Sequence, residues 1–381
     1  MPRGGLKKVF PGGNTCKGFY SYYDHIITPD ATRILVIKGG PGVGKSTFMH
    51  WIGEEMLQRG YDIEHHCCSS DNGSLDGVVI PAIGVALIDG TAPHIVDPKN
   101  PGAVDEIIHL GDYWDEGKLR ADKEHILAAN RRVARLFRTA YSQLAEAKVI
   151  RDEMESYISE CTAFAKVNRA VAKLEREVLD AAPAQYERFP TVRHLFATAI
   201  SPEGVVHHIE TLLPENGRLF LFKGSPGSGR ATALARLAQY AQGRGLDTEV
   251  YHCAFIPEEI ELLVVPEVRA AFLKQTEEVD FKPPGNGPAV TEIDFDRWVD
   301  RQALEIYIAA LMDAGSRFRA ALARGIDYIR QAKLTHDYME GFYVPAMDFK
   351  AIEARRAETL RRILKWAEET TVNHLPRVSA R

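Results

Sequence analysis

The pattern of apolar and polar residues predicts strands that alternate with helices. Residues 34–37 form a continuous apolar run, which is typical of a strand buried on both faces of a parallel sheet. Apolar residues then recur at helical spacing from Phe48 to Leu57, and Gly60 ends that pattern. Further short runs read as strands of the same sheet, at residues 62–68, 77–80 and 85–88. We therefore expect an α/β fold with parallel sheets.

Long helical patterns follow this region. Residues 124–158 place most of their apolar positions on one helical stripe, and residues 164–179 continue with a second helical pattern. Pro183 and Pro190 then interrupt any helix. Matching helical patterns recur later in the chain, at about residues 295–343 and 350–369.

An internal repeat with an offset of 185 residues relates the two halves of the chain. The offset carries Lys38-Gly39 to Lys223-Gly224, and Glu155 to Glu340. Two copies nearly fill the 381 residues, a length that itself favours two domains. We expect two tandem cores, each with a helical appendage: residues 1–188, with the appendage at about 116–182, and residues 189–381, with the appendage at about 295–370.

The apolar run at residues 34–37 leads into a glycine-rich loop that fits the pattern G-x-x-x-x-G-K-[ST] at every fixed position. Its glycines permit positive φ and close approach to a phosphate, so that successive N–H groups form an anion nest. Lys45 would contact the β and γ phosphates, and Ser46 would offer its hydroxyl to Mg²⁺. The expected nucleotide-binding residues are Gly39, Gly40, Pro41, Gly42, Val43, Gly44, Lys45, Ser46 and Thr47.

The apolar strand at residues 85–88 delivers Asp89 at its carboxyl end. A carboxylate there is expected to hold Mg²⁺ opposite Ser46. Gly90 and Thr91 follow, so the glutamate that typically follows this aspartate in AAA-type ATPases is missing. The guanine-selecting motif N-K-x-D is also missing, which disfavours a GTPase.

The catalytic base must then come from another position. Asp71 and Asp76 are candidates, because loops at the carboxyl ends of parallel strands face the ligand. Each aspartate has an alternative reading as an Asx-turn or a helix cap. Thr91, His94 and Asp97 are candidates for contact with phosphate or substrate, or simple loop residues.

The corresponding loop of the second half, residues 224–232, keeps the glycines but lacks the residues expected to bind phosphate and Mg²⁺. Arg230 stands at the lysine position, Ala231 at the hydroxyl position, and Lys274 where the first half has Asp89. We expect a structural or regulatory pseudo-site. A sharper hypothesis is that Arg230 or Lys274 reaches the γ-phosphate of the first site as an arginine finger.

The helical appendages carry two basic clusters. Interspersed acids and the net charge of −5 favour solvated helix faces, so no nucleic-acid partner is expected. The pairs Asp152/Glu155 and Asp337/Glu340 are carboxylate sites or, alternatively, partners in salt bridges. The basic residues are Arg131, Arg132, Arg135 and Arg138 in one cluster and Arg355, Arg356, Arg361, Arg362 and Lys365 in the other.

The five cysteines, an odd number scattered along the chain, indicate reduced thiols. The first residues lack the apolar region of a signal peptide, and no apolar run is long enough to span a bilayer. We therefore expect a cytoplasmic protein with no membrane contact.

Taken with these motifs, the chain resembles the P-loop NTPase superfamily and, within it, a family of duplicated P-loop ATPases. The resemblance lies in residues 39–47, 89–94, 111–116 and 224–232. It implies ATP binding and hydrolysis at Lys45, Ser46, Thr47 and Asp89, with Mg²⁺ as cofactor. Because the second loop departs from the family's pattern, it implies one nucleotide per chain.

Three functions fit these observations. The leading hypothesis is an Mg²⁺-dependent ATPase whose nucleotide state moves one unit relative to the other. The first alternative is a phosphotransferase for a small molecule or nucleotide held near Asp71, Asp76 and His94, with a lid formed from Arg120, Arg131 or Arg132. The second is a non-catalytic nucleotide sensor or scaffold that binds a protein partner through the helices.

Overall fold

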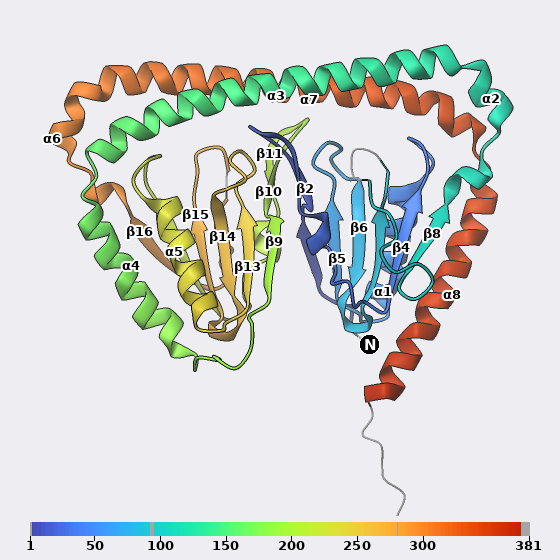
Figure 1. The fold of residues 1–381 in the computed structure, drawn as a ribbon, viewed down its shortest axis with the longest axis horizontal. Coiled ribbons are helices and arrows are strands. Elements are labelled where there is room, and N and C mark those ends of the chain that lie inside the picture. Colours follow the sequence, from blue (N-terminus) through green and yellow to red (C-terminus); the bar gives the residue numbers. More distant parts are fainter. Residues whose placement is uncertain (1, 92–94, 280, 375–381) are drawn as a thin grey trace, which may run out of the picture.

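The computed structural model describes residues 2–91, 95–279 and 281–374. Two six-stranded sheets stand side by side, and two long helices cross above both of them (Figure 1). We call the N-terminal sheet with its helix the first core and the other the second core. None of the helices in these ranges combines the length and apolar character that a bilayer crossing requires.

The first core consists of β1 (Leu6–Val9), β4 (Arg33–Lys38), α1 (Lys45–Gln58), β5 (Ile63–Cys67), β6 (Leu75–Ile80), β7 (Val85–Asp89) and β8 (Asp105–His109). The strand order is β1-β5-β6-β7-β4-β8. The buried strand β4 pairs in parallel with both β7 and β8. The apolar face of α1, with Phe48 and Ile52, packs against Leu35 and Ile37 of β4. The helix and the buried strand predicted from the sequence are thus confirmed.

The expectation of parallel sheets is wrong for part of each sheet. In the first core, β6 runs antiparallel to its neighbours β5 and β7. Only residues 81–84 connect β6 to β7, and Gly84 there adopts a φ of 62°. A connection this short can close a hairpin, but parallel strands need a much longer crossover. The sheets are therefore mixed.

The second core consists of β9 (Val192–Phe196), β12 (Arg218–Lys223), α5 (Arg230–Gly243), β13 (Thr248–His252), β14 (Ile260–Val265), β15 (Ala270–Lys274) and β16 (Ala289–Asp294). Its order, read from β9, is β9-β13-β14-β15-β12-β16, which matches the first core strand for strand. The starts of α1 and α5, at Lys45 and Arg230, are 185 residues apart, as the sequence repeat predicts.

The remaining helices are α2 (Glu116–Ala121), α3 (Lys123–Glu160), α4 (Phe164–Val178), α6 (Arg301–Leu304), α7 (Ile308–Tyr343) and α8 (Phe349–His374). The predicted helix at 295–343 starts only at α6, where the Asp300 carboxylate accepts hydrogen bonds from the N–H groups of Gln302 and Ala303, at 3.0 and 3.1 Å. A 3-10 turn, Glu305–Tyr307, then separates α6 from α7. The long helices α3 and α7 lie antiparallel and form a roof over both cores (Figure 1).

The last helix in each half of the sequence packs against the core of the other half. Val167, Val171 and Leu174 of α4 join the apolar cluster of α5 in the second core. Ile352 and Ile363 of α8 join the cluster of α1 in the first core. The 38 residues of α3 span about 57 Å, which is enough to carry the chain from one core to the other. The expected units 1–188 and 189–381 therefore describe the sequence repeat, whereas in space the two units exchange α4 and α8.

This exchange is reciprocal. The N–H of Asp115 donates to the carbonyl of Ala346 at 2.8 Å, and the N–H of Asp300 donates to the carbonyl of Cys161 at the same distance. Each partner in the second pair is related to one in the first by the 185-residue offset. The two halves are consequently related by an approximate twofold axis.

The cores also touch each other directly beside this axis. Phe10 and Phe196 exchange two backbone hydrogen bonds of 2.9 Å. Two hairpins lie in the centre of the molecule under the roof, β2 (Gly12–Thr15) with β3 (Gly18–Ser21) and β10 (Thr198–Ser201) with β11 (Gly204–His207) (Figure 1).

Candidate functional site

The first loop, residues 39–47, connects the end of β4 to the start of α1. Gly42 and Gly44 adopt φ values of 64° and 87°, which other residues rarely do. Gly39 does not adopt a positive φ, contrary to expectation. It is needed for close approach instead, because a Cβ there would lie 2.7 Å from Cγ2 of Val43.

Several backbone N–H groups of the loop donate no hydrogen bond within the described chain. The N–H groups of Gly40 and of residues 42–46 have no hydrogen-bond acceptor among the residues that the structure describes. They lie at the N-terminus of α1, where the helix dipole also favours an anion. This part of the site is therefore an open anion nest.

Lys45 and Asp89 meet beside the nest. The pairing of β4 with β7 sets Asp89 opposite Ile37, just before the loop. The Lys45 ammonium donates to the carbonyls of Gly40 and Gly39, at 2.8 and 3.2 Å, and lies 3.6 Å from Oδ2 of Asp89. The two side chains are only 12% and 15% exposed, so their charges interact in a partly dehydrated environment.

Neighbouring groups orient the expected metal ligands. Oδ1 of Asp89 accepts hydrogen bonds from the N–H and the hydroxyl of Thr91, at 2.9 and 2.6 Å. The Ser46 hydroxyl oxygen accepts from the N–H of Leu75 at 3.0 Å. Among the other candidates, Asp97 accepts a hydrogen bond from Lys38, and His94 lies outside the described residues.

The two candidate bases have different environments. Asp76 is buried on β6, and burial, followed by the nearby charge of Asp89, raises its pKa to about 7. Asp71 is partly exposed; its Oδ2 accepts from the Ser74 hydroxyl at 2.8 Å, and its Oδ1 lies 3.2 Å from the ammonium of Lys333. Asp71 therefore contacts α7, and this contact between the two halves of the chain has no signal in the sequence.

The corner between α7 and α8 contacts the first loop. A Cβ on Gly40 would lie 2.6 Å from the ring of Tyr343, at the end of α7. A Cβ on Gly42 would lie 3.1 Å from Cβ of Glu340, one turn earlier. The loop is therefore in contact with the corner where α7 gives way to α8, and this corner belongs to the other half of the sequence.

The predicted carboxylate pairs form ion pairs along their own helices. Asp337 pairs with Lys333, and Glu340 lies 3.5 Å from Nδ1 of His336. In the other half, Asp152 pairs with Lys148, and Glu155 lies 3.3 Å from Nε of Arg151.

The second loop, residues 224–232, is closed by its own side chains. The Arg230 guanidinium donates to the carbonyl of Gln275 inside the second core, and burial lowers its pKa to about 10. Lys274 is buried and paired with Glu259. Neither side chain reaches the first loop, so the hypothesis of an arginine finger from these residues is wrong.

A carboxylate also lies on the second nest. Asp296 accepts a hydrogen bond of 2.7 Å from the N–H of Ser225, within that loop. A cavity of about 410 Å³ adjoins this loop and is lined by charged groups of both signs, among them Arg151, Arg230, Arg319 and Glu278.

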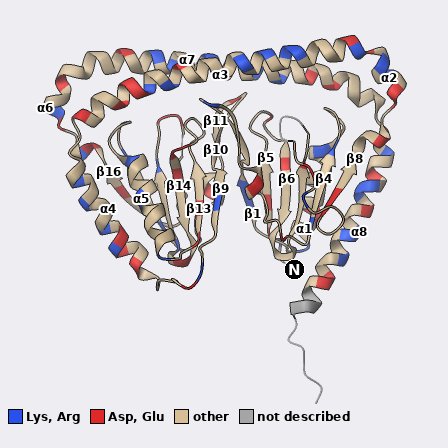
Figure 2. Cartoon of the chain, viewed as in Figure 1, with Lys and Arg blue, Asp and Glu red and all other residues tan. Residues whose placement is uncertain are grey.

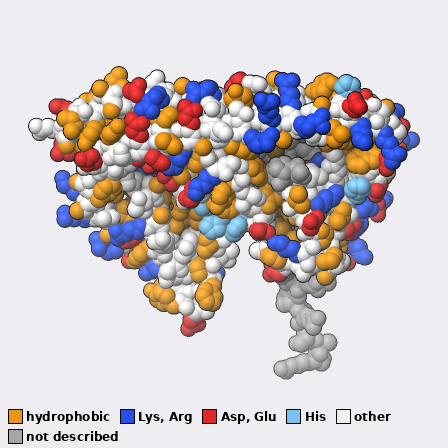
Figure 3. All heavy atoms as spheres, turned by 45° about the horizontal axis from the view of Figure 1, so that its top comes forward, with side chains coloured by type: hydrophobic (Ala, Val, Ile, Leu, Met, Phe, Trp, Pro, Cys, Tyr) orange, Lys and Arg blue, Asp and Glu red, His pale blue; other side chains and the backbone are white. Residues whose placement is uncertain are grey.

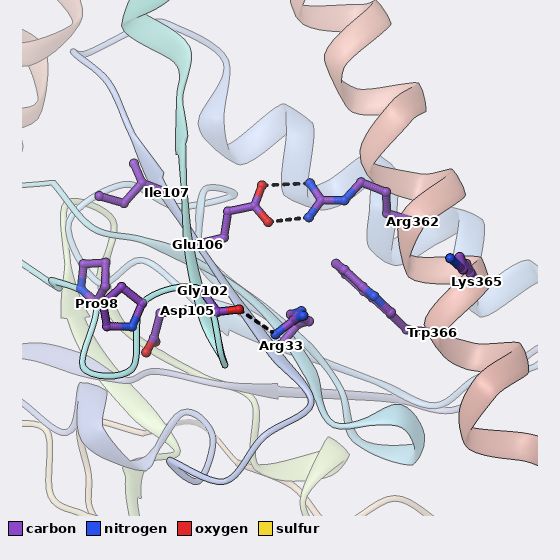
Figure 4. Close-up of a pocket in the computed structure, with 10 residues that line it drawn as sticks. Arg33, Pro98, Gly102, Asp105, Glu106, Ile107, Arg362, Lys365 and Trp366 are labelled. Carbon is purple, nitrogen blue, oxygen red and sulfur yellow. Dashed lines mark hydrogen bonds and ion pairs between the residues drawn. The ribbon is translucent and has the colours of Figure 1, made fainter. Parts of the chain in front are cut away.

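A larger cavity of about 560 Å³ lies between β8 and α8, away from either loop. Figure 4 shows it, with Arg362 bonded to Glu106 and Arg33 bonded to the carbonyl of Gly102. Asp105 in its wall pairs with Ile34 at the start of β4, whereas the first loop follows the end of that strand. This cavity is therefore separate from the candidate site.

The basic clusters of α3 and α8 differ in their pairing. In α8, Arg355 and Arg362 form ion pairs with Glu106. The four arginines of α3 are exposed, and no carboxylate in the described chain lies within 4.0 Å of them: Arg131, Arg132, Arg135 and Arg138. Charged residues spread along all the long helices (Figure 2), and Lys and Arg gather on the half of the roof above the first core (Figure 3).

In comparisons with known proteins, no protein-family model, curated protein or solved structure matches the chain.

Proposed function

We propose that the chain binds Mg²⁺-ATP at the first loop and hydrolyses it there. The observation that carries this proposal is the open nest of residues 40–46, with the Lys45 ammonium and the Asp89 carboxylate at its edge. A triphosphate would take up the unused N–H groups, and Lys45 would turn from the loop carbonyls to the phosphates. Adenine is favoured over guanine only by the absence of N-K-x-D.

The donor atoms present fit Mg²⁺. The Ser46 hydroxyl and the Asp89 carboxylate are hard oxygen ligands, which is the type that Mg²⁺ prefers. Thr91 holds one carboxylate oxygen of Asp89 and leaves the other toward the loop. Bound there, the ion would neutralise charge on the phosphate oxygens.

The second loop is proposed to be a pseudo-site that arose by duplication. The shared strand order and the constant offset support the duplication. The buried Arg230 and the carboxylate of Asp296 on the nest support the loss of nucleotide binding.

Nucleotide state is proposed to move α7 and α8 relative to the first core. Tyr343 and Glu340 contact the glycines that would surround a γ-phosphate, so a phosphate entering or leaving would press on or release this corner. The Asp71–Lys333 ion pair gives a second link between the loop region and α7. The α3/α7 roof would carry the movement to the second core.

The roof is also the proposed docking surface for a protein partner. The unpaired arginines of α3 favour a partner with an acidic face. At the repeat-related positions of α7, only Arg317 remains basic, and it is paired with Glu153. A cytoplasmic location is proposed because the cysteines are unpaired thiols.

The phosphotransferase alternative has less support. Of the arginines considered for a lid, Arg120 pairs with Glu116 on α2, and Arg131 and Arg132 are exposed on the roof.

Release of phosphate from ATP, measured with and without Mg²⁺, tests the proposal. The expected result is Mg²⁺-dependent turnover that Lys45→Ala lowers by at least about 100-fold, a loss typical of removing one electrostatic stabiliser. Arg230→Ala is the matched control at the second loop and should keep most of the turnover. Turnover unaffected by Lys45→Ala would overturn the proposal.

A further inference from the structure

Glu340 of α7 lies against the first loop, although it belongs to the other half of the sequence. Its Cβ and Cγ lie 3.1 and 3.4 Å from the position that a Cβ would occupy at Gly42. The contact is possible because Gly42 has no side chain. The Glu340 side chain is 33% exposed, so its carboxylate can reach both the loop and solvent water.

A histidine accompanies this carboxylate. Nδ1 of His336, one turn earlier on α7, lies 3.5 Å from a carboxylate oxygen of Glu340. The pair is therefore arranged so that the imidazole can orient the carboxylate without neutralising it permanently, as an arginine would.

The second half of the chain provides an internal comparison. Glu155 stands at the position equivalent to Glu340 and lies beside the glycine loop at Gly227, but it contacts that position with its backbone, whereas Glu340 uses its side chain. The residue equivalent to His336 is Arg151, and its guanidinium forms an ion pair with Glu155. The glutamate is thus bound to a permanent cation in the half that has also lost the equivalents of Lys45, Ser46 and Asp89.

The acids of the first core are less suited to act as the base. Asp89 is held by Thr91 and lies beside Lys45. Asp71 is held by Ser74 and Lys333. Asp76 is buried on β6, with 4% of its surface exposed, which disfavours the approach of an attacking water.

We propose that Glu340, oriented by His336, is the catalytic base for ATP hydrolysis at the first loop. This inference rests on the proposed function. The oxygen of a water held by Glu340 attacks the γ-phosphorus as the bond from phosphorus to the bridging oxygen breaks. The water proton passes to the Glu340 carboxylate, the electron pair of the broken bond stays on ADP, and inorganic phosphate leaves. Glu340 then returns the proton to solvent. The base thus comes from α7, in the other half of the sequence, so turnover requires the α7–α8 corner to contact the loop.

The test separates binding from turnover in Glu340→Gln, which keeps the size of the side chain. Affinity for Mg²⁺ and a non-hydrolysable ATP analogue is measured by calorimetry, and kcat by phosphate release. The expected result is a kcat lowered by about 100-fold or more with affinity within about threefold of wild type. Glu340→Asp retracts the carboxylate by one methylene. Its kcat should lie between those of the wild type and Glu340→Gln.

Glu155→Gln is the matched control, since it removes the equivalent carboxylate of the second half, and its kcat should stay within about twofold of wild type. His336→Arg copies the second half and should lower kcat by about tenfold, because it ties Glu340 to a fixed cation. A kcat in Glu340→Gln within threefold of wild type would overturn this inference and leave the proposed function standing. Loss of nucleotide binding in Lys45→Ala together with full turnover would instead contradict the proposed function itself.

Discussion

The carboxylate of Asp296 accepts hydrogen bonds from both the backbone N–H and the hydroxyl of Ser225, at 2.7 and 2.9 Å. Its counterpart in the first half is Gly111, which has no side chain to offer. An internal anion therefore lies on the second nest, while the first nest is open. We propose that this difference gives the two similar loops different capacities to bind phosphate.

Removal of the Asp296 carboxylate is expected to free the second nest. In a Lys45→Ala background, which disables the first loop, Asp296→Ala should gain binding of inorganic phosphate with a dissociation constant in the millimolar range, about −4 kcal/mol. Calorimetry or phosphate-dependent amide shifts would measure it. Asp300→Ala, which removes a helix cap nearby, is the control and should gain nothing. If Asp296→Ala gains nothing either, the carboxylate is not what closes the loop.

Arg193 is expected to be essential for the contact between the cores. Its guanidinium donates to both carboxylate oxygens of Glu64 on β5, at 2.9 and 2.6 Å. Burial alone would raise the pKa of Glu64, but His66, at 3.6 Å, and the hydrogen bonds and charge of Arg193 hold that pKa well below its ordinary value. Arg193→Ala would leave that carboxylate buried and unpaired, so the free energy of unfolding should fall by about 3 kcal/mol. Urea denaturation measures this change.

The control for this prediction is Arg324→Ala. Arg324 also joins the two halves, through an ion pair with Glu146 across the roof, but its side chain is 48% exposed. An exposed pair contributes little, so the loss should stay below about 1 kcal/mol. Equal losses in the two variants would contradict the assignment of Arg193 as a buried bridge.

The buried carboxyl of Asp76 makes stability depend on pH. Burial raises its pKa to about 7, whereas an aspartate in the unfolded chain titrates near 4. Between these values the folded state keeps a proton that the unfolded state has lost, so stability falls as pH rises from about 4 to about 7 and then levels off. Asp76→Asn should remove on the order of 3–4 kcal/mol of this pH-dependent decline in stability.

Unfolding free energies measured at pH 4.5 and pH 8 would test this. Glu261 occupies the equivalent position in the second core, with its pKa also raised by burial to about 7, so Glu261→Gln should have the same effect. Asp24→Asn, at an exposed carboxylate, serves as the control. A decline that persists unchanged in both buried variants would show that other groups cause it.

The contact between Gly40 and Tyr343 predicts a coupled pair of substitutions. Gly40→Ala would press a methyl group against the Tyr343 ring, only 2.6 Å away, and should lower stability by about 1–3 kcal/mol. Tyr343→Ala removes the obstacle, so the double variant should be more stable than the sum of the single effects by about 1 kcal/mol. Strictly additive effects in the double-mutant cycle would mean that the α7–α8 corner does not rest on the first loop.

Local structure was largely predictable from the sequence, because it depends on local patterns. The apolar run of β4, the glycines of the first loop and the periodicity of α1 each indicate their own element, and Asp89 follows from the end of an apolar strand. The antiparallel course of β6 was missed, although the short link of residues 81–84, ending in Gly84, was a usable signal for a hairpin.

The exchange of α4 and α8 could not be predicted in the same way. The apolar stripe of α4, with Val167 and Val171, shows which face is buried but not which core buries it. For the same reason, Lys333 could not be recognised as the partner of Asp71, because that contact depends on the path of α7. The sequence repeat indicates Glu340 as one member of a carboxylate pair. Its proposed role as catalytic base depends on its position beside Gly42, which only the structure shows.

Calorimetric titration of the whole chain with Mg²⁺ and a non-hydrolysable ATP analogue tests the central claim most directly. The account predicts one site per chain, with affinity lowered by at least about 100-fold in Lys45→Ala and unchanged in Arg230→Ala. Two tight sites per chain, or binding that survives Lys45→Ala and is lost in Arg230→Ala, would contradict it.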